Sequence, residues 1–145
     1  MVDARPMRSS FEEFPYYRFL GIEVEEAKPG FARLSLPTGP NVSGGIHGSV
    51  HGGILASIAD IAMLEALLPM FNDKETPGGT IDLNLSYLRP ALGQKVFVEA
   101  SVLRKGRRVA VTEISILDDQ SRLCARGRVL YAVREKELDS GDHPA

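Results

Sequence analysis

One long run of helix-forming and aliphatic residues constrains this 145-residue chain more than any other feature. The run extends from His51 to Leu68, with two glycines directly after the histidine and Pro69 closing it. It is apolar on nearly every side, so a helix built from it must be surrounded by other elements instead of lying on a surface. Only two charges interrupt it, Asp60 and Glu65, and they point about 140° apart around the helix axis.

These two acids therefore cannot share one solvated face of the helix. Glu65 lies near the C-terminal end, where we expect it to reach water. Asp60 lies in the middle of the run among apolar residues, where free access to water is not expected. Aspartate is a poor helix former and is costly to bury without a partner. Its position therefore indicates either a structural partner or a chemical role.

Composition is typical of one globular domain and excludes several classes of function. Hydrophobic residues make up 43% and charged residues 25%, and the formal net charge of −2 indicates neither a nucleic-acid nor a membrane partner. The first ten residues lack the apolar core of a secretory signal, and the helix 54–68 is expected to be too short and too charged to span a bilayer. The single cysteine, Cys124, excludes an intrachain disulfide and a thiolate-rich metal site, so we expect a cytoplasmic protein.

Hydrophobic periodicity and turn residues place the other elements around this helix. A hairpin is predicted over residues 21–27 and 31–36, after a short helical or irregular segment that Pro15 interrupts. A glycine-rich loop then leads into the helix, and four strands are predicted over residues 80–88, 95–104, 109–117 and 123–134. Both chain ends, 1–10 and 135–145, are predicted to be loose tails, so residues 1–145 form one domain with its core at about 20–134.

The first strand after the helix is predicted to have one wet face. Its polar residues alternate with apolar ones at a period of two, and they are Thr80, Asp82, Asn84 and Ser86. A hairpin, one buried helix and a four-stranded meander fit an α+β fold in which an antiparallel sheet wraps around the helix.

Three segments resemble hotdog-fold acyl-CoA thioesterases of the PaaI-like type. One is His51-Gly52-Gly53 with Asp60 nine positions after the histidine, and another is the strand-forming segment 79–91, which ends in Arg-Pro-Ala. The third is the basic hairpin that begins at Arg104. With the order of elements, the resemblance covers roughly residues 20–134. It implies a hotdog fold, with one long central helix, and hydrolysis of an acyl-CoA to a free acid and coenzyme A.

The resemblance also implies a site at a subunit interface. It assigns the backbone N–H of Gly52 to the thioester carbonyl, Asp60 to the role of general base or nucleophile, and Thr80 to holding the water. His51 is included in the catalytic set because it is expected to fix the entrance of the helix. The substrate-binding residues would be Gly53, Tyr87, Arg104, Arg107 and Arg108, and the only coenzyme involved would be the coenzyme A of the substrate.

One position departs from the family pattern. Relatives often carry asparagine or glutamine six residues before the histidine, where this chain has Gly45. Either Asn41 supplies that contact from a longer loop, or the contact is missing. Both alternatives remain open from the sequence.

Each candidate also has a plain structural interpretation. Gly52 and Gly53 would suit any tight loop entering a helix, and a buried Asp60 could simply be paired. A run of arginines is usually a solvated hairpin, although its cations also suit the phosphates of coenzyme A. His47 and His51 stand four apart without an acidic ligand, so no metal site is expected.

Two other functions on the same fold are alternatives to thioester hydrolysis. The alternatives are an acyl-thioester dehydratase or hydratase, and a non-catalytic acyl-ligand-binding protein.

Gly52 and Asp60 stand about 12 Å apart along one helix, too far to act on one thioester carbonyl. We therefore expect a homo-oligomer. It should be at least a dimer, and we expect a tetramer built as a dimer of dimers.

Overall fold

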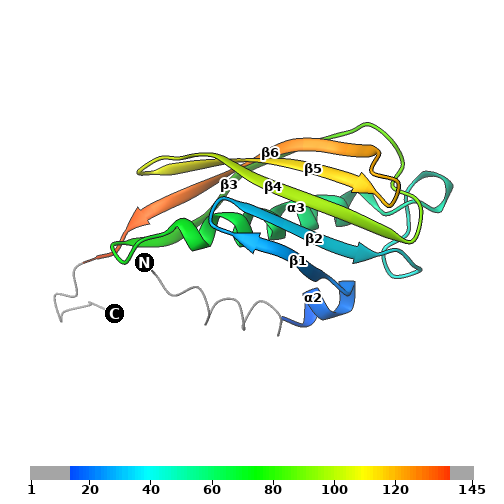
Figure 1. The fold of residues 1–145 in the computed structure, drawn as a ribbon, viewed down its shortest axis with the longest axis horizontal. Coiled ribbons are helices and arrows are strands. Elements are labelled where there is room, and N and C mark those ends of the chain that lie inside the picture. Colours follow the sequence, from blue (N-terminus) through cyan, green and yellow to red (C-terminus); the bar gives the residue numbers. More distant parts are fainter. Residues whose placement is uncertain (1–13, 138–145) are drawn as a thin grey trace.

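The structure, a computed structural model, describes residues 14–137. Six antiparallel strands form one sheet that curves around a single long helix, α3 (Figure 1). The elements in chain order are α2 (Pro15–Leu20), β1 (Glu23–Lys28), β2 (Phe31–Pro37), η1 (Ile46–Gly48), α3 (Gly52–Leu67), η2 (Leu68–Met70), β3 (Glu75–Tyr87), β4 (Lys95–Lys105), β5 (Val109–Asp118) and β6 (Leu123–Glu135). The predicted α+β architecture, a sheet wrapped around one central helix, is confirmed.

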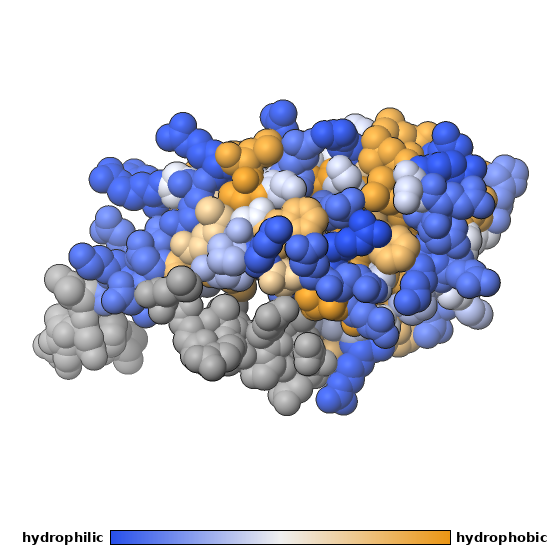
Figure 2. All heavy atoms as spheres, in the orientation of Figure 1, coloured by the Kyte–Doolittle hydropathy of each residue, from blue (hydrophilic) through white to orange (hydrophobic). Residues whose placement is uncertain are grey.

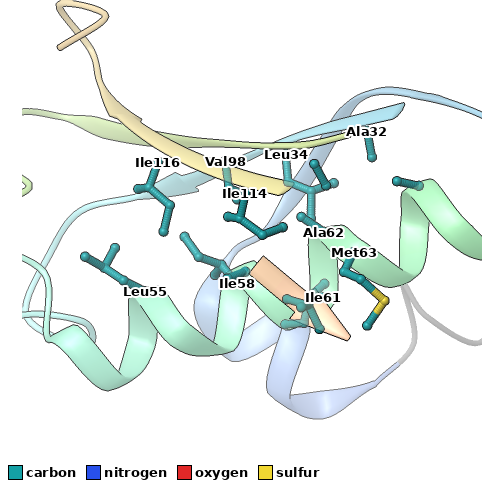
Figure 3. Packing of buried hydrophobic residues seen from close by; sticks show 14 of the residues in the cluster. Ala32, Leu34, Leu55, Ile58, Ile61, Ala62, Met63, Val98, Ile114 and Ile116 are labelled. Atoms are coloured by element: carbon teal, nitrogen blue, oxygen red, sulfur yellow. The ribbon is translucent and has the colours of Figure 1, made fainter. Parts of the chain in front are cut away.

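The core lies between α3 and the concave face of the sheet. Leu55, Ile58 and Ala62 of the helix point toward Val98 and Ile114 of the central strands (Figure 3). These side chains are fully or almost fully buried, and together they form one continuous hydrophobic cluster. Burial of such aliphatic side chains stabilises the fold by roughly 1.5–3 kcal/mol each. The predicted central position of α3 is therefore confirmed, although a stripe of the helix that includes Ser57, Asp60 and Leu64 is only partly buried.

The segment Gly52–Met70 is longer than the sequence predicts for this helix. It has 19 residues and a mean hydropathy of 1.7, so by length and composition alone it could cross a membrane. The expectation that this helix is too short to span a bilayer is therefore wrong. In this fold it is the central helix, with half of the segment buried inside the protein. A core helix and a membrane span share the same composition when both must be surrounded by apolar atoms.

The order of strands in the sheet is β1-β2-β4-β5-β6-β3. The predicted four-stranded meander is therefore wrong in one element, because β3 pairs with β6 and not with β4. The chain leaving β3 crosses the end of the sheet, where the N–H groups of Leu88 and Arg89 donate to the carbonyl of Cys124. As a result, β3 forms one edge of the sheet and leaves a row of backbone groups without a neighbouring strand.

A bulge in β3 interrupts the predicted alternation of side chains between the two faces of this strand. Thr80 and Tyr87 are seven residues apart, so a regular strand would direct them to opposite faces. Both nevertheless hydrogen-bond α3. The register shifts between Thr80 and Asp82, which leaves Ile81 as an extra residue in the pairing with β6. Thr80 therefore reaches the helix although it is exposed as predicted, and Ile81 is 56% exposed.

Pro15 is the first residue of α2, as its fixed φ and missing N–H allow at a first helical position. The predicted helical or irregular segment before Phe14 lies outside the described residues. The prediction for Glu65 on α3 is wrong. Glu65 does not reach water; it is only 7% exposed. Tyr17 of α2 lies close enough to Glu65 for the charge of this acid to raise the pKa of the phenol.

The boundaries of the remaining elements agree with the sequence to within a few residues, except that β3 begins at Glu75. The predicted loose tails fall largely on residues 1–13 and 138–145, which lie outside the described residues. Hydrophobic side chains also reach the surface between polar ones, as the orange patches in Figure 2 show. At the end of β3, Tyr87 and Leu88 are 54% and 60% exposed.

Candidate active site

Asp60 is held by a hydrogen bond from the neighbouring edge strand. The hydroxyl of Thr80 donates to Oδ1 of Asp60 over 2.7 Å. The Asp60 residue is half-buried. The expectation that Asp60 is kept from free access to water is thus met only in part.

Two phenols surround this carboxylate from other elements. Burial raises the pKa of Tyr17, and the negative charges of Asp60 and Glu65 raise it further. Burial likewise raises the pKa of Tyr131 on β6, a hydrogen bond involving the Gly79 backbone opposes that rise, and the charge of Asp60 adds to it. Both hydroxyls therefore remain protonated at neutral pH.

The entrance of α3 presents backbone donors. His51 is the N-cap, and its Nδ1 accepts the N–H of Gly53 over 2.9 Å. The carbonyl of His51 accepts the N–H groups of Ile54 and Leu55, which polarises the peptide that carries the Gly52 N–H. Among residues 14–137 no acceptor faces the Gly52 N–H. This N–H is therefore a free donor at the positive end of the helix.

Tyr87 covers the other side of Gly52. Its hydroxyl donates to the carbonyl of Gly52 over 2.6 Å, and a Cβ placed on Gly52 would lie 3.3 Å from the ring. Only glycine leaves the backbone at this position open beside the ring. Gly52 and Tyr87 both belong to the wall of a cavity of about 280 Å³. The cavity is lined by Gly45, Ile46, Ser49, Val50, Gly52, Leu55, Tyr87, Leu88, Arg89, Pro90 and Ala91.

One chain does not bring Gly52 and Asp60 together. The two residues lie on the same straight helix, eight residues or about 12 Å apart. A carbonyl whose oxygen is bound by the Gly52 N–H cannot also have its carbon within reach of the same chain's Asp60. Thr80 belongs with Asp60, and His51, Gly53 and Tyr87 belong with Gly52. The predicted site residues thus form two half-sites at two points of α3.

The basic hairpin lies on the side of the Asp60 half-site. Thr80 pairs with Tyr131, and Tyr131 pairs with Ala110, so Thr80 and Ala110 stand two strands or about 10 Å apart. The turn before Ala110 carries Arg107 and Arg108, which with Arg134 line a second cavity that also includes Glu135 and Glu137. The structure therefore brings these cations together at one end of the sheet.

Lys105 of this hairpin is not available for a ligand. Its ammonium group binds both carboxylate oxygens of Glu75 at 2.7 Å, and both side chains are largely buried. Burial by itself would raise the pKa of Glu75, but the hydrogen bonds from Lys105 and from the Asn72 N–H hold that pKa below its usual value. The ion pair stabilises the junction of β3 and β4, so Lys105 has a structural role.

Arg134 is the residue of this region that the sequence analysis misses. It lies on β6 beyond the predicted turn, and the N–H of Val133 next to it donates to the carbonyl of Arg108. Only the pairing of β6 with the hairpin brings it near Arg107. Arg104 is exposed and lies next to a register shift in β4, outside the wall of this cavity.

His47, the other histidine among the described residues, is not part of a metal centre there. His47 lies in η1 with a positive φ of 58°, exposed at the surface of the loop. Within residues 14–137 no cluster of three His, Cys, Asp or Glu side chains has the geometry to hold a metal ion. The prediction that the reaction needs no metal and no cofactor remains a prediction.

Comparison with known proteins identifies the family. The thioesterase superfamily profile matches residues 47–125, which include both half-sites. The chain belongs to the thioesterase superfamily. The predicted hotdog fold and the predicted enzyme class, a thioester hydrolase, are confirmed with it.

Individual relatives extend the match over most of the chain. The medium/long-chain acyl-CoA thioesterase YigI of Escherichia coli is 32% identical over 132 residues, covering 82% of this chain and 85% of that protein. Human acyl-coenzyme A thioesterase 13 is 31% identical over 116 residues, covering 78% of this chain and 81% of that protein. The BH2602 protein of Bacillus halodurans, solved with CoA, is 26% identical with a TM-score of 0.74, covering 92% of this chain and 85% of that one.

Proposed function

We propose that the protein is an acyl-CoA thioesterase of the PaaI-like type that releases a free acid and coenzyme A. The single observation that carries this proposal is the carboxylate of Asp60, half-buried in an apolar helix and fixed by Thr80 at 2.7 Å. A ligand-binding protein gains nothing from a costly acid at this place. The names of YigI and acyl-coenzyme A thioesterase 13 support acyl-CoA as the substrate.

The chemistry requires a hydrogen-bond donor to the thioester oxygen at one half-site and a base at the other. The Gly52 N–H, free and at the helix N-terminus, stabilises the negative charge that develops on the thioester oxygen. Asp60 takes a proton from a water held by Thr80, and the water oxygen bonds to the acyl carbon. When the C–S bond breaks, the proton passes from Asp60 to the departing thiolate. In the alternative, Asp60 attacks directly and water then cleaves the acyl-enzyme anhydride.

The separation of the half-sites supports an active site shared by two chains. Two antiparallel copies of α3 would bring Gly52 of one chain to the partner's Asp60, and symmetry would form this pair twice. The exposed edge of β3, thirteen residues long, offers the strand along which two sheets would join. The functional unit is then at least a dimer, with a tetramer as a dimer of dimers.

The position of the cations supports binding of the coenzyme at the Asp60 side. Phosphate groups are recognised by arginine through paired, charge-assisted hydrogen bonds. Arg107 and Arg108 stand about two strands from Thr80, with Arg134 beside them and Arg104 further along the hairpin. Coenzyme A would enter only as part of the substrate, in the cytoplasm, without a metal or a further cofactor.

A thiol-release assay tests this function. The wild-type protein should release coenzyme A from acyl-CoAs of at least one class in a series of short, medium, long and aromatic chains. Asp60→Asn keeps the size of the side chain but removes the base, so kcat should fall by about two orders of magnitude or more. Asp73→Asn, at an exposed turn, is the matched control and should keep wild-type turnover. A folded Asp60→Asn variant with wild-type turnover would refute the proposal.

A further inference from the structure

The wall of the cavity beside Gly52 includes a serine that the mechanism above does not use. Ser49 lines this cavity, and the residue as a whole is only 4% exposed. Its Oγ is not one of the enclosed side-chain atoms that lack a partner within residues 14–137, so this oxygen is open to the cavity. A hydroxyl in that position can donate a hydrogen bond to a ligand atom.

The backbone holds this serine in a fixed place. The N–H groups of Gly44 and Gly45 both donate to the Ser49 carbonyl, at 3.2 and 3.0 Å. The next residue, Val50, donates its N–H to the carbonyl of Ala91 across the cavity wall. The loop is thereby closed on itself and fastened to the chain that follows β3. A hydroxyl on such a loop is positioned before any ligand arrives.

Ser49 also occupies the place toward which a side chain at residue 45 would project. A Cβ built on Gly45 would lie 2.3 Å from Ser49 Oγ and 2.9 Å from the carbonyl oxygen of Val50. A side chain at residue 45 would therefore require the Ser49 hydroxyl to turn away and the loop backbone at Val50 to shift. Asn41 does not compensate, because it is exposed and is not part of the cavity wall. In this chain the hydroxyl of Ser49 is the polar side-chain group in that direction.

We propose that Ser49 is a second donor to the thioester carbonyl oxygen, acting beside the Gly52 N–H. The two residues line the same cavity, and a carbonyl oxygen accepts two hydrogen bonds. Donors fixed in advance at a developing oxyanion act chiefly in the transition state. The inference rests on the proposed thioester hydrolysis and adds a residue to it. In this inference the side-chain donor at the Gly52 half-site is Ser49, and it is neither residue 45 nor residue 41.

Removal of the hydroxyl tests this role. Ser49→Ala should lower kcat/KM by about 10- to 100-fold, mainly through kcat, on every acyl-CoA that the wild type hydrolyses. The thermal midpoint of unfolding should stay the same or rise, because the removed group has no partner in the free protein. Ser49→Thr keeps a hydroxyl and should recover most of the loss. Ser43→Ala removes a hydroxyl that bonds the Pro40 carbonyl in the same loop, and it should have no effect.

The outcomes separate this inference from the proposed function. Wild-type kcat/KM in Ser49→Ala, or equal losses in Ser49→Ala and Ser49→Thr together with a lower unfolding midpoint, would overturn the role of Ser49 alone. An active wild type inactivated by Asp60→Asn would leave the thioesterase function standing in either case. A wild type without thiol release on any acyl-CoA would overturn both.

Discussion

The hydroxyl of Thr80 lies 2.7 Å from Oδ1 of Asp60, and this contact depends on one extra residue in the edge strand. Without the bulge at Ile81, Thr80 would point to the opposite face from Tyr87, and only one of the two could reach α3. With the bulge, β3 contacts the helix both at the carboxylate and at the Gly52 carbonyl. One strand thus positions a residue of each half-site.

The first prediction concerns this hydrogen bond. Thr80→Val keeps the shape of the side chain but removes the donor that orients Asp60 and the water. We expect kcat to fall by about 10-fold or more with a smaller change in KM, because the loss is one of orientation for the reacting step. Steady-state kinetics of thiol release measures both constants. Thr80→Ser retains the hydroxyl and should stay within a few fold of wild type; equal losses in both variants would argue against this role.

The second prediction concerns the arginines of the hairpin. Reversing Arg107 and Arg108 to glutamate should raise KM for acyl-CoA, since phosphate contacts contribute to binding more than to the chemical step. The effect should be smaller on an acyl thioester that lacks the nucleotide. Arg128→Glu, on an exposed position of β6, is the control for each single reversal, Arg107→Glu or Arg108→Glu. Equal losses on both substrates would mean that the hairpin is merely structural.

The third prediction concerns stability. Thr112 of β5 is fully buried, and its Oγ1 has no hydrogen-bond partner in the described part of the chain. Replacing it by the isosteric valine removes an unsatisfied hydroxyl, so the free energy of unfolding should rise by about 1 kcal/mol. Urea unfolding with an unchanged slope measures the difference. Thr38→Val provides the contrast, because that hydroxyl donates to the Gly93 carbonyl and its loss should not stabilise the protein. A destabilised Thr112→Val would refute the assignment.

Local sequence patterns predict most of the fold because burial leaves a clear period in the chain. The apolar run from His51 to Leu68 can only be a surrounded helix, and the strands that follow it alternate with a period of two. The pairing of β3 with β6 leaves no such signal. It depends on how the segment after Tyr87 crosses the sheet, where backbone contacts with Cys124 fix its course.

The site is predictable in part for the same reason. Gly52 and Asp60 are found from their positions on the helix, but the orientation of Thr80 requires the bulge, which alternation alone contradicts. Glu65 near the end of the helix is more buried than Asp60 in its middle, which is the reverse of what position along the helix predicts. Ser49 has no motif of its own. Its significance appears only when the loop brings it to the place of a side chain at Gly45.

The central claim is that each active site combines Gly52 of one chain with Asp60 of another. Two inactive parents test it: Asp60→Asn, and Gly52→Val, whose side chain would press on the Tyr87 ring and block the N–H. After dissociation and reassociation of an equal mixture, half of the dimers should be mixed, and each should regain one intact site. Thiol release should then return to about one quarter of wild type by symmetry. If subunit exchange is verified and activity stays at the level of the parents, the shared site is contradicted.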